Sequence, residues 1–214
     1  MSFKAALGFF ASLAITALLS AGPVRAEPLK LVGFGDSLMA GYQLPATDAF
    51  PAKLEKALRD EGHAVEIANA GVSGDTTSGG LARLDWSIPD GTDGVILELG
   101  ANDALRGIAP EETEKNLDAM LARLKERGIP VLLAGMLAPP NMGADYAARF
   151  NGIYARLAQK HGVPLYPFFL DGVATHADLQ LDDGMHPNAK GVDAMVAAML
   201  QPVETFITSI QAKE

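Results

Sequence analysis

One serine, one histidine and one aspartate have the residue types and spacing needed for acyl-transfer chemistry. Ser37 lies in the segment Gly35-Asp36-Ser37-Leu38, and Asp183 precedes His186 by three residues near the far end of the chain. A serine hydroxyl is a weak nucleophile until a base takes its proton. His186 can be that base, and Asp183 can hold its tautomer and stabilise the imidazolium. We therefore expect a nucleophilic centre built from these three side chains.

The same chemistry needs hydrogen-bond donors for the negative charge that develops on the carbonyl oxygen of a substrate. The backbone N–H groups of Ser37 and Gly74 and the side-chain amide of Asn102 are the candidate donors. Asp103 and Arg106 follow Asn102 closely, so we expect their loop to line the substrate pocket, where the two side chains could also form a surface ion pair.

The elements that must position these residues alternate between short apolar runs and longer amphipathic ones. Such alternation predicts a parallel sheet with helices on both faces. The expected fold is one three-layer α/β/α sandwich of the flavodoxin-like class, with a five-stranded parallel sheet. Strands are expected at residues 29–34, 65–68, 95–99, 131–134 and from Leu165, and helices at 50–60, 111–127, 145–161 and 189–210, the last broken near Pro202.

The candidate residues follow predicted strands directly. Ser37, Gly74 and Asn102 come after the first, second and third strands, in loops rich in glycine and small polar residues. Ligands of open parallel sheets bind beyond the carboxyl ends of the strands. One loop near the end of the chain can bring Asp183 and His186 to the same edge.

The first 26 residues have the organisation of a signal peptide. Lys4 is followed by an apolar run, and Val24-Arg25-Ala26 offers small residues for cleavage. We expect cleavage after Ala26 and a hydrolase domain over residues 27–214, and hence an exported protein, periplasmic or secreted. The alternative is a retained membrane anchor, although the apolar run falls short of the ~20 residues that span a bilayer.

Composition and motifs exclude several other classes. The 17 basic and 26 acidic side chains give a net charge of −9, which argues against nucleic acid as a partner. The chain has no cysteine, and no cluster of ligand residues indicates a metal site. The glycine pattern of a dinucleotide-binding loop is interrupted at Leu38. A flavodoxin-like phosphate cradle is disfavoured by Asp36. No cofactor is predicted, and the oligomeric state stays open.

Four segments together resemble the SGNH, or GDSL-type, hydrolase family. They are Gly35-Asp36-Ser37-Leu38, the glycine at 74, Gly100-Ala101-Asn102-Asp103 and Asp183-Gly184-Met185-His186, in the family's order over nearly the whole mature chain. The match is closest to the bacterial periplasmic branch of thioesterases, lysophospholipases and arylesterases. The resemblance implies that Ser37, Asp183 and His186 form the triad and that Ser37, Gly74 and Asn102 form the oxyanion hole.

The resemblance also implies substrates. They are small-molecule acyl esters and thioesters, including aryl esters, acyl thioesters and lysophospholipids. The alternatives are a carbohydrate acetylesterase and a noncatalytic carbohydrate-binding relative. The second would be expected to have lost the serine or the histidine, and this chain keeps both.

Individually, the same residues have simpler interpretations. Ser37 and Asp183 could cap helices, and Asn102 could be a turn residue. Asp182 is the rival of Asp183 for the triad, although the spacing favours Asp183. The three remaining histidines have no companion motif and are expected to be structural or solvated: His63, His161 and His176.

Overall fold

The computed structural model describes residues 27–212, so the predicted signal peptide lies outside the described residues. Five strands form one sheet: β1 (Leu29–Gly35), β2 (Val65–Gly71), β3 (Gly94–Glu98), β4 (Val131–Ala134) and β5 (Leu165–Tyr166). All neighbouring strands are parallel, and their order is β2-β1-β3-β4-β5. This order places the carboxyl ends of the first three strands side by side.

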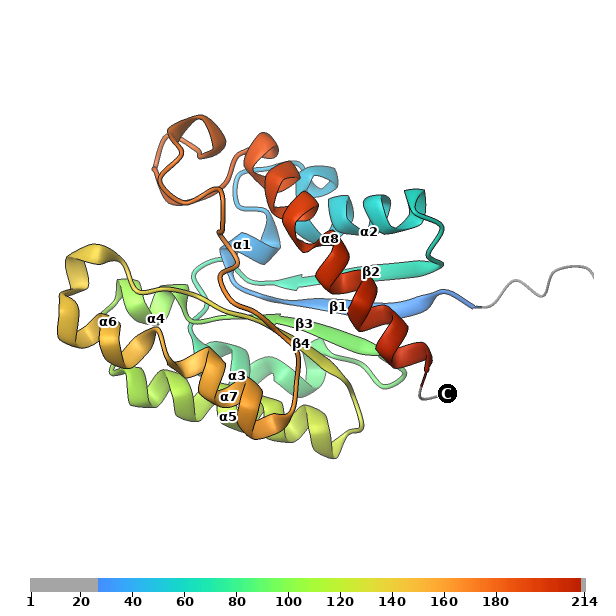
Figure 1. Cartoon of the computed structure of the whole chain (residues 1–214), viewed down its shortest axis with the longest axis horizontal. Coiled ribbons are helices and arrows are strands. Elements are labelled where there is room, and N and C mark those ends of the chain that lie inside the picture. Colours follow the sequence, from blue (N-terminus) through green and yellow to red (C-terminus); the bar gives the residue numbers. More distant parts are fainter. Residues whose placement is uncertain (1–26, 213–214) are drawn as a thin grey trace, which may run out of the picture.

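Helices cover both faces of the sheet, as Figure 1 shows. On one face α2 (Phe50–Asp60) packs against α8 (Ala189–Gln211), and on the other α5 (Pro110–Glu126) packs against α3 (Thr77–Ser87) and α7 (Ile153–His161). The expected three-layer fold is therefore confirmed. The remaining helices are short: α1 (Ser37–Ala40), α4 (Ala101–Leu105), α6 (Ala144–Phe150) and 3₁₀ turns at Ala46–Asp48, Pro140–Met142 and Ala177–Leu179.

The core follows from the apolar runs of the central strands. Every residue of β3 and β4 is buried, as expected for strands that are covered on both faces. The α5 helix buries Leu117, Leu121 and Leu124 along one side. It has acidic residues in its first turn and basic residues in its last, which complements the helix dipole.

Two helices differ from the expectation. The predicted helix 145–161 is divided into α6 and α7 at Asn151 and Gly152, where the Asn151 side chain accepts a hydrogen bond of 2.8 Å from the Ala138 N–H. The expected break near Pro202 is wrong, because α8 continues to Gln211. Burial of apolar side chains on both sides of the proline outweighs its local cost; they include Met199, Val203 and Phe206.

The sequence did not predict α3. Its buried face carries Gly80 and Arg83 where an amphipathic helix would have large apolar side chains. A Cβ atom at Gly80 would collide with the Leu99 side chain. Glycine therefore lets α3 approach the sheet closely, at the expense of the usual helical pattern.

Both ends of the described chain lie at the edge of the sheet opposite the carboxyl ends of the strands. The β1 strand begins there, and α8 ends there, as Figure 1 shows. Ile210, in the last turn of α8, lies against Gly94 at the start of β3.

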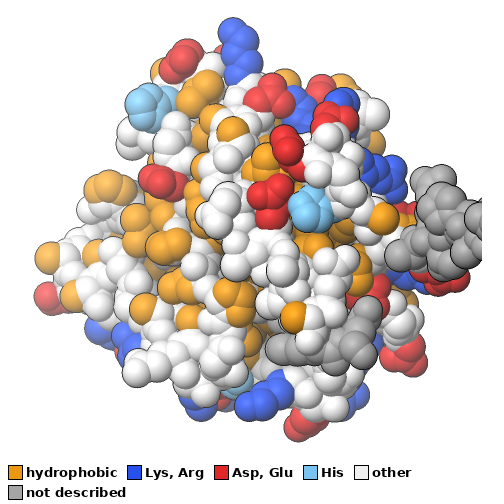
Figure 2. All heavy atoms as spheres, turned by 45° about the vertical axis from the view of Figure 1, so that its right-hand side comes forward, with side chains coloured by type: hydrophobic (Ala, Val, Ile, Leu, Met, Phe, Trp, Pro, Cys, Tyr) orange, Lys and Arg blue, Asp and Glu red, His pale blue; other side chains and the backbone are white. Residues whose placement is uncertain are grey.

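Charged side chains of both signs are interspersed over the face of the molecule drawn in Figure 2. Hydrophobic side chains are exposed between them. No helix within residues 27–212 has both the length and the apolar character needed to cross a membrane.

Candidate active site

The structure brings three distant segments together at the carboxyl edge of the sheet. Ser37 is the first residue of α1, directly beyond β1, and is almost completely buried. His186 Nε2 lies 2.9 Å from Ser37 Oγ, across 149 positions of sequence. His186 Nδ1 lies 2.7 Å from Asp183 Oδ2. The distances are those of a nucleophile, a base and an orienting carboxylate.

Asp183, not its rival Asp182, contacts the histidine. Its second oxygen, Oδ1, accepts hydrogen bonds from the N–H groups of Met185, at 2.9 Å, and His186, at 3.0 Å. Partial burial acts to raise the pKa of Asp183, but these two backbone bonds and the His186 ring outweigh it and lower the pKa to about 2. Asp183 is therefore ionised throughout the pH range in which histidines ordinarily titrate.

The loop that carries the histidine is anchored to α8. Asn188 caps this helix, accepting hydrogen bonds from the N–H groups of Lys190 and Gly191. Its side-chain amide donates to the carbonyl oxygens of Asp178 and Gln180. The cap therefore joins the helix to the preceding loop, two residues from His186.

Tyr42 packs against the His186 ring, a contact that the sequence analysis missed. The Tyr42 and His186 ring centroids are 4.4 Å apart, with an angle of 34° between the planes. A tyrosine five residues after a nucleophile carries no specific signal, because the contact depends on a loop far away in the sequence. The Tyr42 ring limits the space into which the imidazole can rotate.

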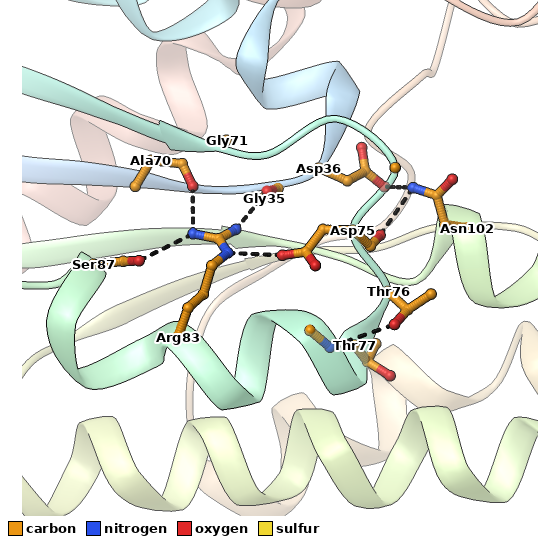
Figure 3. Close-up of polar contacts among 12 residues, drawn as sticks. Gly35, Asp36, Ala70, Gly71, Asp75, Thr76, Thr77, Arg83, Ser87 and Asn102 are labelled. Carbon is orange, nitrogen blue, oxygen red and sulfur yellow. Dashed lines mark hydrogen bonds and ion pairs between the residues drawn. The ribbon is translucent and has the colours of Figure 1, made fainter.

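The candidate oxyanion donors also lie at this edge. Within the described part of the chain, the N–H groups of Ser37 and Gly74 have no hydrogen-bond acceptor. The Asn102 amide nitrogen donates to Asp36 Oδ2, at 3.1 Å, and to the Asp75 carbonyl oxygen, at 2.9 Å (Figure 3). These bonds fix the amide, and an oxyanion would have to replace or share one of them.

Comparison with known proteins identifies the family. Residues 34–194 match the model of the GDSL-like lipase/acylhydrolase family. The chain belongs to this family. The matched region contains all the residues of the candidate site, and the family's enzymes are serine hydrolases, as the resemblance implied.

Individual relatives of this GDSL-like hydrolase agree with that assignment. An arylesterase of Vibrio mimicus is 43% identical over 82% of this chain and 88% of its own. The thioesterase 1/protease 1/lysophospholipase L1 of Escherichia coli K12 is 38% identical over 81% of this chain and 84% of its own. The solved structure of AlinE4, an SGNH-hydrolase family esterase, matches with a TM-score of 0.72 and 48% identity over 84% of this chain and 96% of its own.

Asp103 does not occupy the position expected of a substrate-binding residue. Its side chain is fully buried and accepts hydrogen bonds from the Thr77 N–H, at 2.8 Å, and from the hydroxyls of Thr77 and Thr113. Burial leaves it unable to line an open pocket, and the surface ion pair with Arg106 is not formed. Arg106 is exposed and donates to the Gly74 carbonyl oxygen at 2.7 Å.

Arg83 of the hydrolase is a second residue that the sequence analysis missed. Its guanidinium donates to the carbonyl oxygens of Gly35 and Ala70, each at 2.8 Å, and to Asp75 Oδ2, at 2.7 Å (Figure 3). It also lies 4.0 Å from the centre of the Phe34 ring. One buried cation thus joins the ends of β1 and β2 to the loop after Gly74.

Arg83→Met should lower the free energy of unfolding by about 3 kcal/mol, because it leaves the Asp75 carboxylate without its partner in a mostly buried site. Urea unfolding measures the change. Arg123→Met is the matched control, since Arg123 pairs with Asp85 in an exposed position and should cost less than ~1 kcal/mol. Equal midpoints for Arg83→Met and Arg123→Met would contradict the role of Arg83.

Proposed function

We propose that the protein is an esterase and thioesterase that works through a covalent Ser37 acyl-enzyme. The observation that supports this most strongly is the unbroken hydrogen-bonded series from Asp183 through His186 to Ser37, at 2.7 and 2.9 Å. Ser37 Oγ attacks the acyl carbon while His186 Nε2 accepts its proton, and the proton then passes to the departing alcohol or thiol. Water attacks the acyl-enzyme, gives a proton to His186 and releases the acid, and the proton returns to Ser37.

The substrates proposed are aryl esters, acyl thioesters and lysophospholipids. The names of the Vibrio and Escherichia relatives support this range. Exposed apolar side chains also follow the carboxyl ends of the strands, where they offer a surface to an acyl chain; they are Tyr42, Val72, Leu105, Leu137 and Met185. A carbohydrate acetylesterase is less favoured, because neither relative is named for that activity.

An organophosphonate should attach one label per chain, on Ser37, because the base beside this hydroxyl makes it the most nucleophilic of the serines. Intact-mass and peptide mass spectrometry measure the stoichiometry and the position. Ser37→Ala should abolish both the label and the hydrolysis of nitrophenyl esters and a thioester. Labelling of Ser73 or Ser78 instead, or full turnover by Ser37→Ala, would disprove the assignment.

Asn102→Ala should lower kcat by ~10²–10³-fold, with KM nearly unchanged, because an oxyanion donor acts on charge that develops in the transition state. The variant also loses two hydrogen bonds that join three loops, so its melting temperature should fall as well. Measuring kcat per folded molecule and thermal unfolding on one preparation separates the effects. A loss of stability without a loss of kcat would remove Asn102 from the oxyanion hole.

Export with cleavage after Ala26 is a further part of the proposal. It is supported by Lys4, the apolar run after it and the small residues before Glu27. Mass spectrometry of the protein from a producing cell should find Glu27 at the amino terminus, in the periplasmic or secreted fraction. Retention of residues 1–26 in the membrane fraction would instead indicate a tethered enzyme.

A further inference from the structure

Two carboxyl groups are buried side by side beneath the nucleophile. Asp36 immediately precedes Ser37, and Glu98 is the last residue of β3, the strand adjacent to β1. Neither residue has any exposed surface. The Asp36 N–H donates to Glu98 Oε2 at 3.3 Å, which brings the two carboxyl groups together in a closed site. Two ionised carboxyl groups held this close repel each other, so the pair favours a state in which one of them carries a proton.

The hydrogen-bond donors around Asp36 favour the ionised form of this carboxyl group. Its Oδ1 accepts the Leu38 N–H at 3.0 Å, and its Oδ2 accepts the Asn102 amide at 3.1 Å. Both donors favour a negative charge. Through these two bonds Asp36 links the amino end of α1, which carries the nucleophile, to the amide proposed for the oxyanion hole.

The surroundings of Glu98 favour the neutral form of its carboxyl group. Its Oε1 has no hydrogen-bond partner among the described residues, and the one contact with a backbone donor is the bond at Oε2. Burial, followed by the nearby charge of Asp36, raises the pKa of Glu98 well above its ordinary range. Burial also raises the pKa of Asp36, to about 6, with the Leu38, His186 and Asn102 interactions opposing it. The two donors at Asp36 and the unpartnered Oε1 of Glu98 favour Glu98 as the group that carries the proton.

The backbone around the pair is shaped to admit it. A Cβ atom on Gly35 would lie 2.5 Å from Glu98 Oε2, so that only glycine lets the carboxyl group lie across the end of β1. On the other side, the Tyr154 hydroxyl donates to the Leu99 carbonyl oxygen at 2.8 Å and not to Glu98. The pair thus lies in a closed site, in which Asp36 is the available hydrogen-bond acceptor for the Glu98 proton.

We propose that Glu98 is a positioning residue for the reaction: its neutral carboxyl donates a hydrogen bond to Asp36, which holds Asn102 and the amino end of α1 in place beside the substrate. This inference rests on the proposed roles of Ser37 and Asn102. The shared proton leaves one negative charge beneath the nucleophile instead of two. A second charge there would repel the developing oxyanion and the Asp36 carboxylate alike.

Replacement of Glu98 by two residues of similar length tests the inference. Glu98→Gln supplies a neutral donor to Asp36 and an acceptor for its N–H, so kcat should stay close to the wild-type value. Glu98→Met supplies neither, and kcat per folded molecule should fall by about 10²-fold with little change in KM, as for a small displacement of reacting groups. The rate of phosphonate labelling of Ser37 should fall in parallel. Thr92→Val is the matched control, because it removes a part-buried hydrogen bond of 2.8 Å to the Pro89 carbonyl oxygen, in the turn just before β3 begins.

Two kinetic outcomes would overturn the inference: an unchanged kcat in folded Glu98→Met, or a loss in Glu98→Gln as large as that in Glu98→Met. The second would mean that an ionised Glu98 is needed.

Infrared spectroscopy tests the proton without relying on turnover or on the folding of Glu98→Met. At about pH 8, where ordinary aspartates and glutamates are ionised, the wild-type protein should show a carbonyl band of one neutral carboxyl group that is missing from Glu98→Gln. Absence of this band in the wild type would disprove a protonated Glu98. The same spectrum of Ser37→Ala should keep the band. Turnover by Ser37→Ala would instead refute the proposed nucleophile and leave the proton assignment standing.

Discussion

The structure of the active-site edge depends on the hydrogen bonds that one buried guanidinium group makes. Arg83 is 6% exposed, and a cation at that depth must be hydrogen-bonded in nearly every direction. It donates to the carbonyl oxygens of Gly35 in β1 and Ala70 in β2 and to the Asp75 carboxylate. Because Ser37 lies two residues beyond Gly35, and Gly74 four residues beyond Ala70, one side chain fixes the origin of two loops. Asp75 then passes the constraint to Asn102 through its carbonyl oxygen.

Carboxyl groups in this site differ in character because their surroundings differ. Asp183 lies near the surface, where backbone N–H groups surround it, and it keeps its charge at low pH. Glu98 lies at the end of a central strand with few donors, so its neutral form is favoured. The first group orients a base, and the second supports a scaffold. Environment, and not residue type, decides which function a carboxyl group can serve.

Local patterns predicted much of the fold and of the candidate site. The apolar runs identified all five strands, most clearly β3 and β4, which are buried on both faces and therefore apolar along their length. The spacing of Asp183 and His186 pointed to one loop, and the position of Ser37 after the first strand pointed to the correct edge of the sheet. These features depend on neighbours in sequence, or on the rule that parallel strands end together.

Contacts between distant segments could not be predicted in the same way. In the sequence Arg83 looks like an ordinary polar residue of a weakly amphipathic helix, because its acceptors come from several segments. Glu98 is the single charged residue of an apolar strand, but its partner lies 62 positions away. The sequence analysis placed Asp103 in the pocket wrongly, because a residue next to Asn102 in a loop is expected to be exposed. In the structure, two threonines from other helices enclose its side chain. The continuation of α8 through Pro202 likewise depends on tertiary packing, which the helix propensity of the local sequence does not reflect.

The position of the two chain ends has a practical consequence. The described chain enters the sheet at β1 and leaves after α8 on the side away from Ser37, as Figure 1 shows. A carrier protein, an affinity tag or a solid support joined at either end would therefore hold the molecule by its base and leave the catalytic edge facing the solution. Insertions in the loops after β1, β2 and β3, and in the loop that carries His186, have no such freedom, because these loops contribute bonds to the network around Ser37.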